Sequence, residues 1–236
     1  MKKVLFLGLI SIFLSGSVFS QGTKPWSEWS KGDIEKMLNK SAWAQSQQKG
    51  ESPPDMRTRT NAGSINPTLG DPGTARVPSE IYLRVRFLSA RPIREGYASR
   101  LLQMQPNATA EVKQQVQTFV DNGFGDFIVV GVNVDGQNPQ TVNPTLGILM
   151  KLNTEAIGDK AYLERKDGKR LPLVEYRPPV ADDMGGKFVF ARTLDGAPFI
   201  TPEADTVRFV LNLSGNLKFN MRFDVDKMVY GDKLEY

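Results

Sequence analysis

Residues 206–225 read TVRFVLNLSGNLKFNMRFDV, two runs of alternating apolar and polar residues that are joined by Ser-Gly-Asn. Alternation with a period of two is the pattern of a half-buried β-strand, and a short glycine-containing connection joins two such strands into a hairpin. The sequence therefore predicts an antiparallel hairpin, residues 206–213 and 217–225, at the centre of the core. Its apolar row is Val207, Phe209, Leu211, Leu213, Phe219, Met221, Phe223 and Val225.

A second hairpin is predicted just upstream. Residues 161–165 and 171–176 are rich in apolar residues and flank Asp167-Gly168, a strong signal for a tight turn. Another strand is expected over residues 187–192, after a Gly-Gly pair. The second half of the chain is therefore predicted to be mostly β.

The middle of the chain predicts a strand, two helices and a strand. Residues 81–88 alternate, with Tyr82, Arg84 and Arg86 on the side expected to face solvent, and residues 127–134 are almost continuously apolar. Between them one helix is expected from Pro92 until Pro106 stops it, and a second from about residue 109 to a C-terminal Gly123.

The N-terminal part predicts an amphipathic helix over residues 31–45. Ser30 and Asp33 have the spacing of a capping box, and Ile34, Met37 and Leu38 fall on one helical face. Residues 47–79 are rich in proline and glycine, so we expect an irregular strap or linker there. The pentapeptide NPTLG occurs at 66–70 and 143–147 and is interpreted as a repeated turn sequence, not a structural repeat. Residues 146–152 are ambiguous between helix and strand.

These elements predict an α+β protein with an antiparallel sheet or sandwich in its C-terminal half. We expect a signal peptide at 1–20, a Trp-rich segment with the amphipathic helix at 21–46, the strap at 47–79 and an α+β domain at 80–236.

The signal peptide is predicted from Lys2-Lys3, the apolar run of residues 4–14 and a permitted cleavage boundary after Ser20. Gln21 is then the first mature residue, and we expect export to the periplasm or the medium. The chain has no cysteine, so no thiol is present for a lipid anchor or a disulfide. No second apolar stretch of membrane length follows.

Composition argues against catalysis. The chain has neither histidine nor cysteine, which removes the commonest general base, the thiolate nucleophile and the usual zinc ligands. No cofactor motif or metal-loop spacing occurs, so we expect a non-enzyme without a cofactor or a metal. The formal charge of +4 becomes +2 without Lys2 and Lys3, which gives no argument for nucleic acid as a partner.

Two groups of residues are candidate binding sites. Trp26, Trp29 and Trp43 have the rings of an aromatic platform for a sugar or peptide, although aromatic residues beside an amphipathic helix more often dock that helix on the core. Four arginines form the second group, a candidate face for the phosphate or carboxylate groups of an anionic envelope polymer or protein. They are Arg84, Arg86, Arg91 and Arg94.

Each arginine also has a structural interpretation, namely a solvated strand face that pairs with acids such as Glu164 or Glu175. An anion-recognition face requires guanidinium groups that protein carboxylates leave unpaired. The two interpretations therefore differ in a feature that a structure shows.

Carboxylate pairs offer the remaining chemistry. Asp182 with Asp183, and Asp224 with Asp226, could serve a glycan-active enzyme, because glycoside hydrolysis runs on two carboxylates without histidine. That mechanism requires two carboxylates that converge in a cleft. The prediction is a non-catalytic extracytoplasmic binding or structural module, with the carboxylate-dependent enzyme as the alternative.

The chain also resembles a family of uncharacterised exported bacterial proteins that open with a Trp-rich segment and a short helix. The resemblance lies in the segments WSEW (26–29), DIEKML (33–38) and SAWA (41–44), and more weakly in GKFVFAR (186–192), KMVY (227–230) and KLE (233–235). The family has no established activity, so the resemblance assigns no functional residue.

Overall fold

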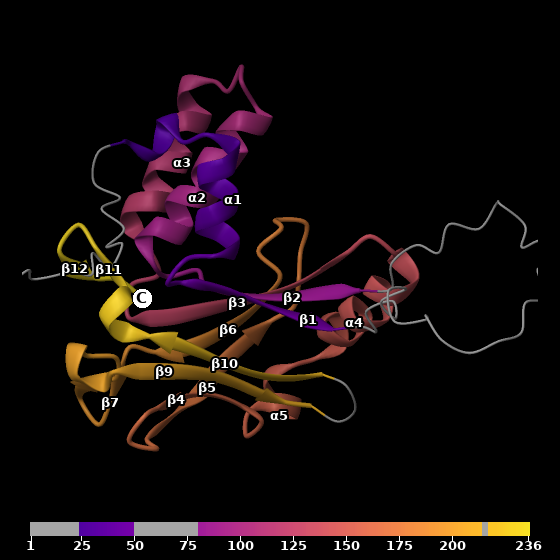
Figure 1. Cartoon of the computed structure of the whole chain (residues 1–236), viewed down its shortest axis with the longest axis vertical. Coiled ribbons are helices and arrows are strands. Elements are labelled where there is room, and N and C mark those ends of the chain that lie inside the picture. The colour runs from indigo at the N-terminus through magenta and orange to yellow at the C-terminus, as the bar shows by residue number, and fades with distance from the viewer. Residues whose placement is uncertain (1–23, 50–79, 214–216) are drawn as a thin grey trace, which may run out of the picture.

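The computed structural model describes residues 24–49, 80–213 and 217–236. It is an α+β structure in which one antiparallel sheet of eight strands curls strongly and three helices stand over one side of it (Figure 1). The strand order is β1-β2-β3-β6-β5-β4-β9-β10. The predicted fold class is therefore confirmed.

The strands of this sheet are β1 (Ala44–Lys49), β2 (Ile81–Phe87), β3 (Phe127–Gly136), β4 (Ala161–Arg165), β5 (Arg170–Arg177), β6 (Gly186–Ala191), β9 (Thr206–Asn212) and β10 (Lys218–Asp224). Two short hairpins flank it, β7 (Thr193–Leu194) with β8 (Ala197–Pro198), and β11 (Val229–Tyr230) with β12 (Lys233–Leu234). Both hairpins predicted from the sequence, β4–β5 and β9–β10, are present.

The sheet curls until its two edge strands approach each other. The side-chain amide Nε2 of Gln45 on β1 donates a hydrogen bond to the backbone carbonyl of Arg222 on β10. Inside the curl, the Phe87 and Phe223 rings meet edge to face with centroids 4.8 Å apart. We call the contact of the Gln45 side chain on β1 with the Arg222 carbonyl on β10 the seam.

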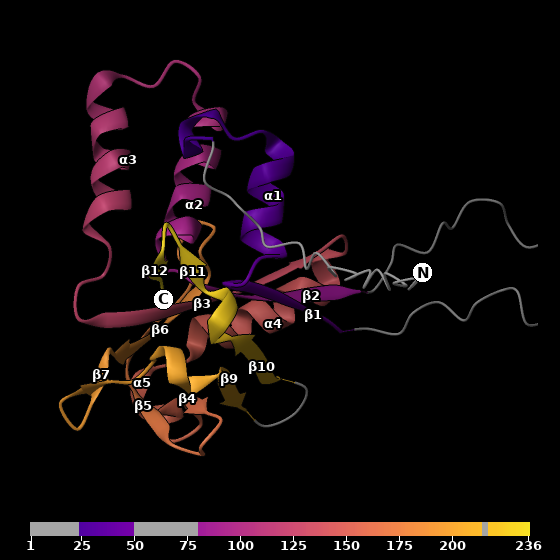
Figure 2. The same ribbon diagram turned by 60° about the vertical axis from the view of Figure 1, so that its left-hand side comes forward.

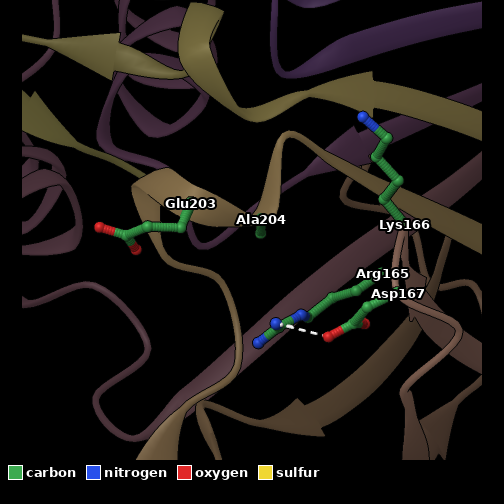
Figure 3. A pocket seen from close by; sticks show the side chains of 5 residues that line it. All are labelled: Arg165, Lys166, Asp167, Glu203 and Ala204. Carbon is green, nitrogen blue, oxygen red and sulfur yellow. Dashed lines mark hydrogen bonds and ion pairs between the residues drawn. The ribbon is translucent and has the colours of Figure 1, made fainter.

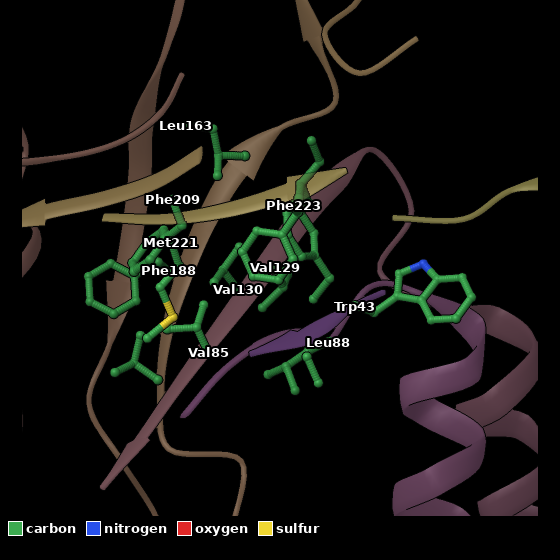
Figure 4. Packing of buried hydrophobic residues seen from close by; sticks show 14 of the residues in the cluster. Trp43, Val85, Leu88, Val129, Val130, Leu163, Phe188, Phe209, Met221 and Phe223 are labelled. Carbon is green, nitrogen blue, oxygen red and sulfur yellow. The ribbon is translucent and has the colours of Figure 1, made fainter. Parts of the chain in front are cut away.

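Alternating side chains of the curled sheet fill its interior. Phe209 is fully buried, and its ring contacts those of Phe188, Phe190 and Phe219, with centroids 5.2, 6.4 and 6.3 Å away. Figure 4 shows Met221 in the same packed layer. The apolar row predicted over residues 206–225 is buried throughout, as expected of strands with one face in the core.

Three helices stand side by side over the sheet (Figure 2): α1 (Lys31–Asn39), α2 (Arg91–Met104) and α3 (Ala110–Asn122). The capping box at the start of α1 is present, with Ser30 and Asp33 each binding the other's backbone N–H. Gly123 follows α3 with a φ of +61°, a conformation that suits glycine. The predicted order of strand, two helices and strand is confirmed as β2-α2-α3-β3.

Two further helices, α4 (Pro139–Lys151) and α5 (Thr154–Ile157), follow β3. Each buries one residue completely, Leu149 and Ile157. The Tyr176 hydroxyl donates to the Leu149 carbonyl at 2.7 Å and fixes α4 to β5. The second NPTLG, residues 143–147, lies inside α4 with Pro144 in the helix, so its interpretation as a turn is wrong.

The N-terminal helix is shorter than predicted. It ends at Asn39, and Ala44–Lys49 forms β1, which pairs with β2 along its full length. Backbone pairing with an open strand edge thus prevails over the helical spacing of Ser41 and Ala42. Residues 47–49, predicted to belong to the strap, lie in this strand. The rest of the strap and the predicted signal peptide lie outside the described residues.

We predict that Phe209→Ala lowers the free energy of unfolding by about 3–5 kcal/mol, because it removes a fully buried ring and leaves a cavity among three others. Urea denaturation followed by circular dichroism measures the change. A loss below about 1 kcal/mol would contradict the central position of this ring.

Candidate functional site

Arg86 is buried against the end of helix α1. Its side chain lies on the outer face of β2, where Nε donates to the Leu38 carbonyl at 2.5 Å and Nη2 donates to the Asn39 side-chain oxygen at 2.8 Å. Nη1 donates to the Tyr97 hydroxyl at 3.0 Å. The residue is 3% exposed. Its prediction as a solvent-facing residue is wrong, because the C-terminal end of α1 covers it.

Arg94 has the same role at the end of helix α3. Its Nε donates to the Val120 carbonyl at 3.0 Å and its Nη1 donates to the Ser89 carbonyl. Burial lowers the pKa of Arg94 from its ordinary value, an effect that nearby Glu235 opposes. The close approach of the guanidinium group to Gly123 leaves no room for a β-carbon there without a shift.

Arg84 and Arg91 are paired with carboxylates. Arg84 Nε lies 2.8 Å from Asp135 on β3, as an ion pair without hydrogen-bond alignment, and its Nη1 donates to Asn39 at 2.5 Å. Arg91 Nε donates to Glu95 at 2.9 Å, and this hydrogen bond raises the pKa of Arg91. The four arginines therefore form no exposed, unpaired cluster, and Glu164 and Glu175 pair with none of them.

The three tryptophans lie in or against the core. Trp29 and Trp43 are buried, and Trp26 packs partly buried against the main core and against the smaller cluster of Ala98, Val116 and Val120. Trp43 Nε1 donates to the Glu235 carbonyl at 2.7 Å, and its ring meets Tyr230 edge to face. This is the docking arrangement, in which the rings leave no shared exposed platform.

Three of the four carboxylates singled out for glycan chemistry are engaged by cations, and the fourth, Asp226, is exposed. Asp182 accepts a hydrogen bond from Lys187 at 2.6 Å, and Asp183 pairs with Arg100. Asp224 accepts one from Lys227 at 2.7 Å, which lowers the pKa of the Asp224 carboxyl. A general acid needs the opposite shift.

A depression of about 180 Å³ lies between β4 and the short helix η3 (Pro202–Ala204). Arg165 in its wall is held by Asp167 at 2.7 Å. Figure 3 shows that the charged ends of Lys166 and Glu203 point away from this pair. The side chains therefore do not converge on a common ligand position.

A different set of arginines lies on strands β5, β4, β9 and β10, the part of the sheet away from helices α1–α3 (Figure 1). Strand register places four residues directly opposite one another across β5, β4, β9 and β10. They are Arg170, Glu164, Arg208 and Arg222, which we call the outer arginine row. The three arginine side chains are 60%, 42% and 66% exposed, respectively.

The outer arginine row has more cations than partners. Glu164 serves both Arg170, at 2.8 Å, and Arg208, at 3.5 Å. Arg222 lies directly opposite Arg208, and like charges in this position are destabilising. The outer residues of these four strands include five cations and three anions, a net charge of +2. They are Arg170, Arg177, Arg208, Lys218, Arg222, Glu164, Glu175 and Asp224.

Part of this row could be found from the sequence. A hairpin with Ser214-Gly215-Asn216 as its turn places residue 208 opposite 222. A two-residue Asp167-Gly168 turn would place 164 opposite 171, whereas the structure pairs 164 with 170. The pairing of β4 with β9 joins the two pairs into one row. Nothing in the local sequence signals that pairing.

Within the described ranges, no helix has the length and apolarity to cross a membrane, and no three acidic side chains are grouped to hold a metal ion. No protein-family model matches the sequence, and the search of curated proteins finds no match. Among solved structures, a novel protein of unknown function from Burkholderia pseudomallei is similar with a TM-score of 0.41 and 11% identity. The alignment covers 60% of this chain and 74% of that chain.

We predict that Arg86→Met lowers the free energy of unfolding by about 1–3 kcal/mol for each buried partner that it leaves without a hydrogen bond. Arg177→Met is the matched control, since Arg177 is exposed and pairs with Glu175, so its loss is about 1 kcal/mol or less. Equal effects in urea denaturation would contradict the anchoring role of Arg86.

We also predict that Arg222→Gln leaves the free energy of unfolding unchanged or raises it by up to about 1 kcal/mol at low salt, because it relieves the repulsion from Arg208. Any gain shrinks in high salt, which screens exposed charges. A loss above about 1 kcal/mol would show that Arg222 is a structural residue.

Proposed function

We propose that the protein is an exported, non-catalytic binding module that recognises an anionic polymer or protein of the cell envelope. The observation that carries the proposal is the outer arginine row, in which two of three exposed guanidinium groups, those of Arg170 and Arg208, share the Glu164 carboxylate, while Arg222 shares Asp224 with Lys227. Guanidinium groups bind carboxylates and phosphates through paired N–H donors. A row with spare donors therefore suits an anionic partner.

A binding role fits the state of the acidic side chains better than an enzymatic one. Asp182, Asp183 and Asp224 each have a basic partner. A glycosidase needs one carboxyl group kept protonated and a second opposite it across the substrate. Lys227 has the reverse effect on Asp224, whose pKa it lowers. No observation favours the enzyme.

Export is supported by the N-terminal sequence. The basic residues Lys2 and Lys3, the apolar run after them and the boundary at Ser20 match a secretory signal. An exported chain without cysteine must depend on packing for stability, and the aromatic interior of the sheet supplies such packing.

We predict that the full-length chain, expressed in a bacterium, is recovered from the periplasm or the medium with Gln21 as its first residue. This mature form should be retained on heparin-agarose, elute with added salt because exposed charges are screened, and release no reducing sugar from polysaccharides. Fractionation, N-terminal sequencing and a reducing-end assay provide the three measurements.

Intact Met1 on a cytoplasmic product would contradict export. Absence of retention on heparin-agarose would contradict the binding role, and release of reducing ends that is lost in Asp182→Asn or Asp224→Asn would favour the enzyme.

A further inference from the structure

We propose that the outer arginine row binds a linear acidic polysaccharide that lies across strands β5, β4, β9 and β10. The inference rests on the proposed binding function and names the chemical class of its ligand. It is carried by the geometry of the row, the surplus of guanidinium donors and the other side chains on the same face.

The row crosses four neighbouring strands of the curled sheet, and its three arginine side chains are exposed. Arg170, Glu164, Arg208 and Arg222 occupy directly opposed positions on four neighbouring strands. Adjacent strands are separated by about 4.8 Å, so the row extends over roughly 14 Å. A single small anion occupies only part of that length. An extended polymer with a charge on successive units can contact several arginines at once, and simultaneous contacts raise affinity strongly.

The donors of the row are incompletely used. Glu164 is largely buried and divides its two oxygens between Arg170 and Arg208. Arg222 has Asp224 at 3.3 Å, but Lys227 also binds that carboxylate, at 2.7 Å. A ligand carboxylate between Arg208 and Arg222 would receive guanidinium N–H groups from both strands and relieve their repulsion.

Uncharged polar groups lie next to the arginines. Asn220 is exposed on β10, two residues before Arg222, and Asn212 is exposed on β9. A side-chain amide both donates and accepts hydrogen bonds, which suits sugar hydroxyls. Alternating carboxylate and hydroxyl groups are the surface chemistry of an acidic polysaccharide.

The same face is poorly suited to nucleic acid. Single-stranded nucleic acid binds where aromatic rings stack on successive bases. Among the outward-facing residues of β5, β4, β9 and β10, Tyr162 is the one aromatic. The Arg170 guanidinium lies over its ring at 4.4 Å, so one side of that ring is already covered.

The test compares two double variants of equal charge. Arg208→Gln with Arg222→Gln removes two cations from the row. The matched control, Lys31→Gln with Lys113→Gln, removes two exposed cations from helices α1 and α3. Binding of the mature protein to alginate, a linear polyuronate, is measured by biolayer interferometry at several salt concentrations. Melting temperatures establish that each variant is folded.

We expect the row variant to bind alginate at least about tenfold more weakly and to lower the slope of log affinity against log salt by about 2, or roughly one per arginine. The control variant should keep the wild-type affinity within about twofold. In competition, alginate should displace the bound protein at lower concentration than poly-glutamate or oligo-dT of equal charge, and neutral dextran should not displace it.

Equal losses of affinity for alginate in the two double variants would overturn the proposal, because net charge alone would then account for the attraction. Tighter binding of poly-glutamate or oligo-dT than of alginate would overturn the ligand class. In that case, retention on heparin-agarose would still support the binding function. Loss of heparin retention in the wild-type protein would instead remove the function on which the proposal rests.

Discussion

The helical layer of this protein depends on two buried guanidinium groups that form no hydrogen bond to a carboxylate among the described residues. Each donates one N–H to a backbone carbonyl near the C-terminal end of a helix, Arg86 to Leu38 of α1 and Arg94 to Val120 of α3. Those carbonyls have no partner within their own helices, and the helix dipole makes that end partly negative. Each arginine therefore donates hydrogen bonds to helix-terminal carbonyls that lack an N–H partner. In return, the partly negative helix end offsets the free-energy cost of burying the guanidinium charge.

This arrangement explains why the helices stand over the sheet instead of lying flat on it. A flat helix would need a broad apolar stripe against an apolar sheet face. The outer face of β2 and β3 instead presents Arg84, Arg86, Asn133 and Asp135 to the helical layer and the loop before β6. Asp183 in that loop binds Arg100 of α2, and its carbonyl accepts from Tyr97. Polar, directional contacts thus join the layers alongside the apolar residues that α1 and α2 add to the shared core.

Local sequence patterns predicted those parts of the fold that are determined by neighbouring residues in the sequence. The two hairpins, the capping box at Ser30 and the positive φ of Gly123 each follow from a few neighbouring residues. The burial of Arg86 does not, because the helix end that covers it is some 48 residues away in sequence.

The candidate site divides in the same way. In the outer arginine row, the pair 208 with 222 follows from its own turn, whereas the pair 164 with 170 differs by one residue from the register that a two-residue Asp167-Gly168 turn sets. The complete row also requires β4 to pair with β9, a contact between distant segments that no short-range pattern encodes. The arginines that lie close together in sequence are therefore not the exposed ones, because the fold pairs or buries them. They are Arg84, Arg86, Arg91 and Arg94.

The seam between β1 and β10 closes the curl of the sheet through a side chain. A closed ladder of backbone hydrogen bonds sets the radius of a barrel, because strand number and stagger determine it. Here the amide of Gln45 contacts the Arg222 carbonyl, and β1 and β10 are the two ends of the hydrogen-bonded strand order. The circumference of the sheet is therefore not fixed by a backbone ladder across the seam, and β10, the strand at that edge, carries Arg222 of the outer row.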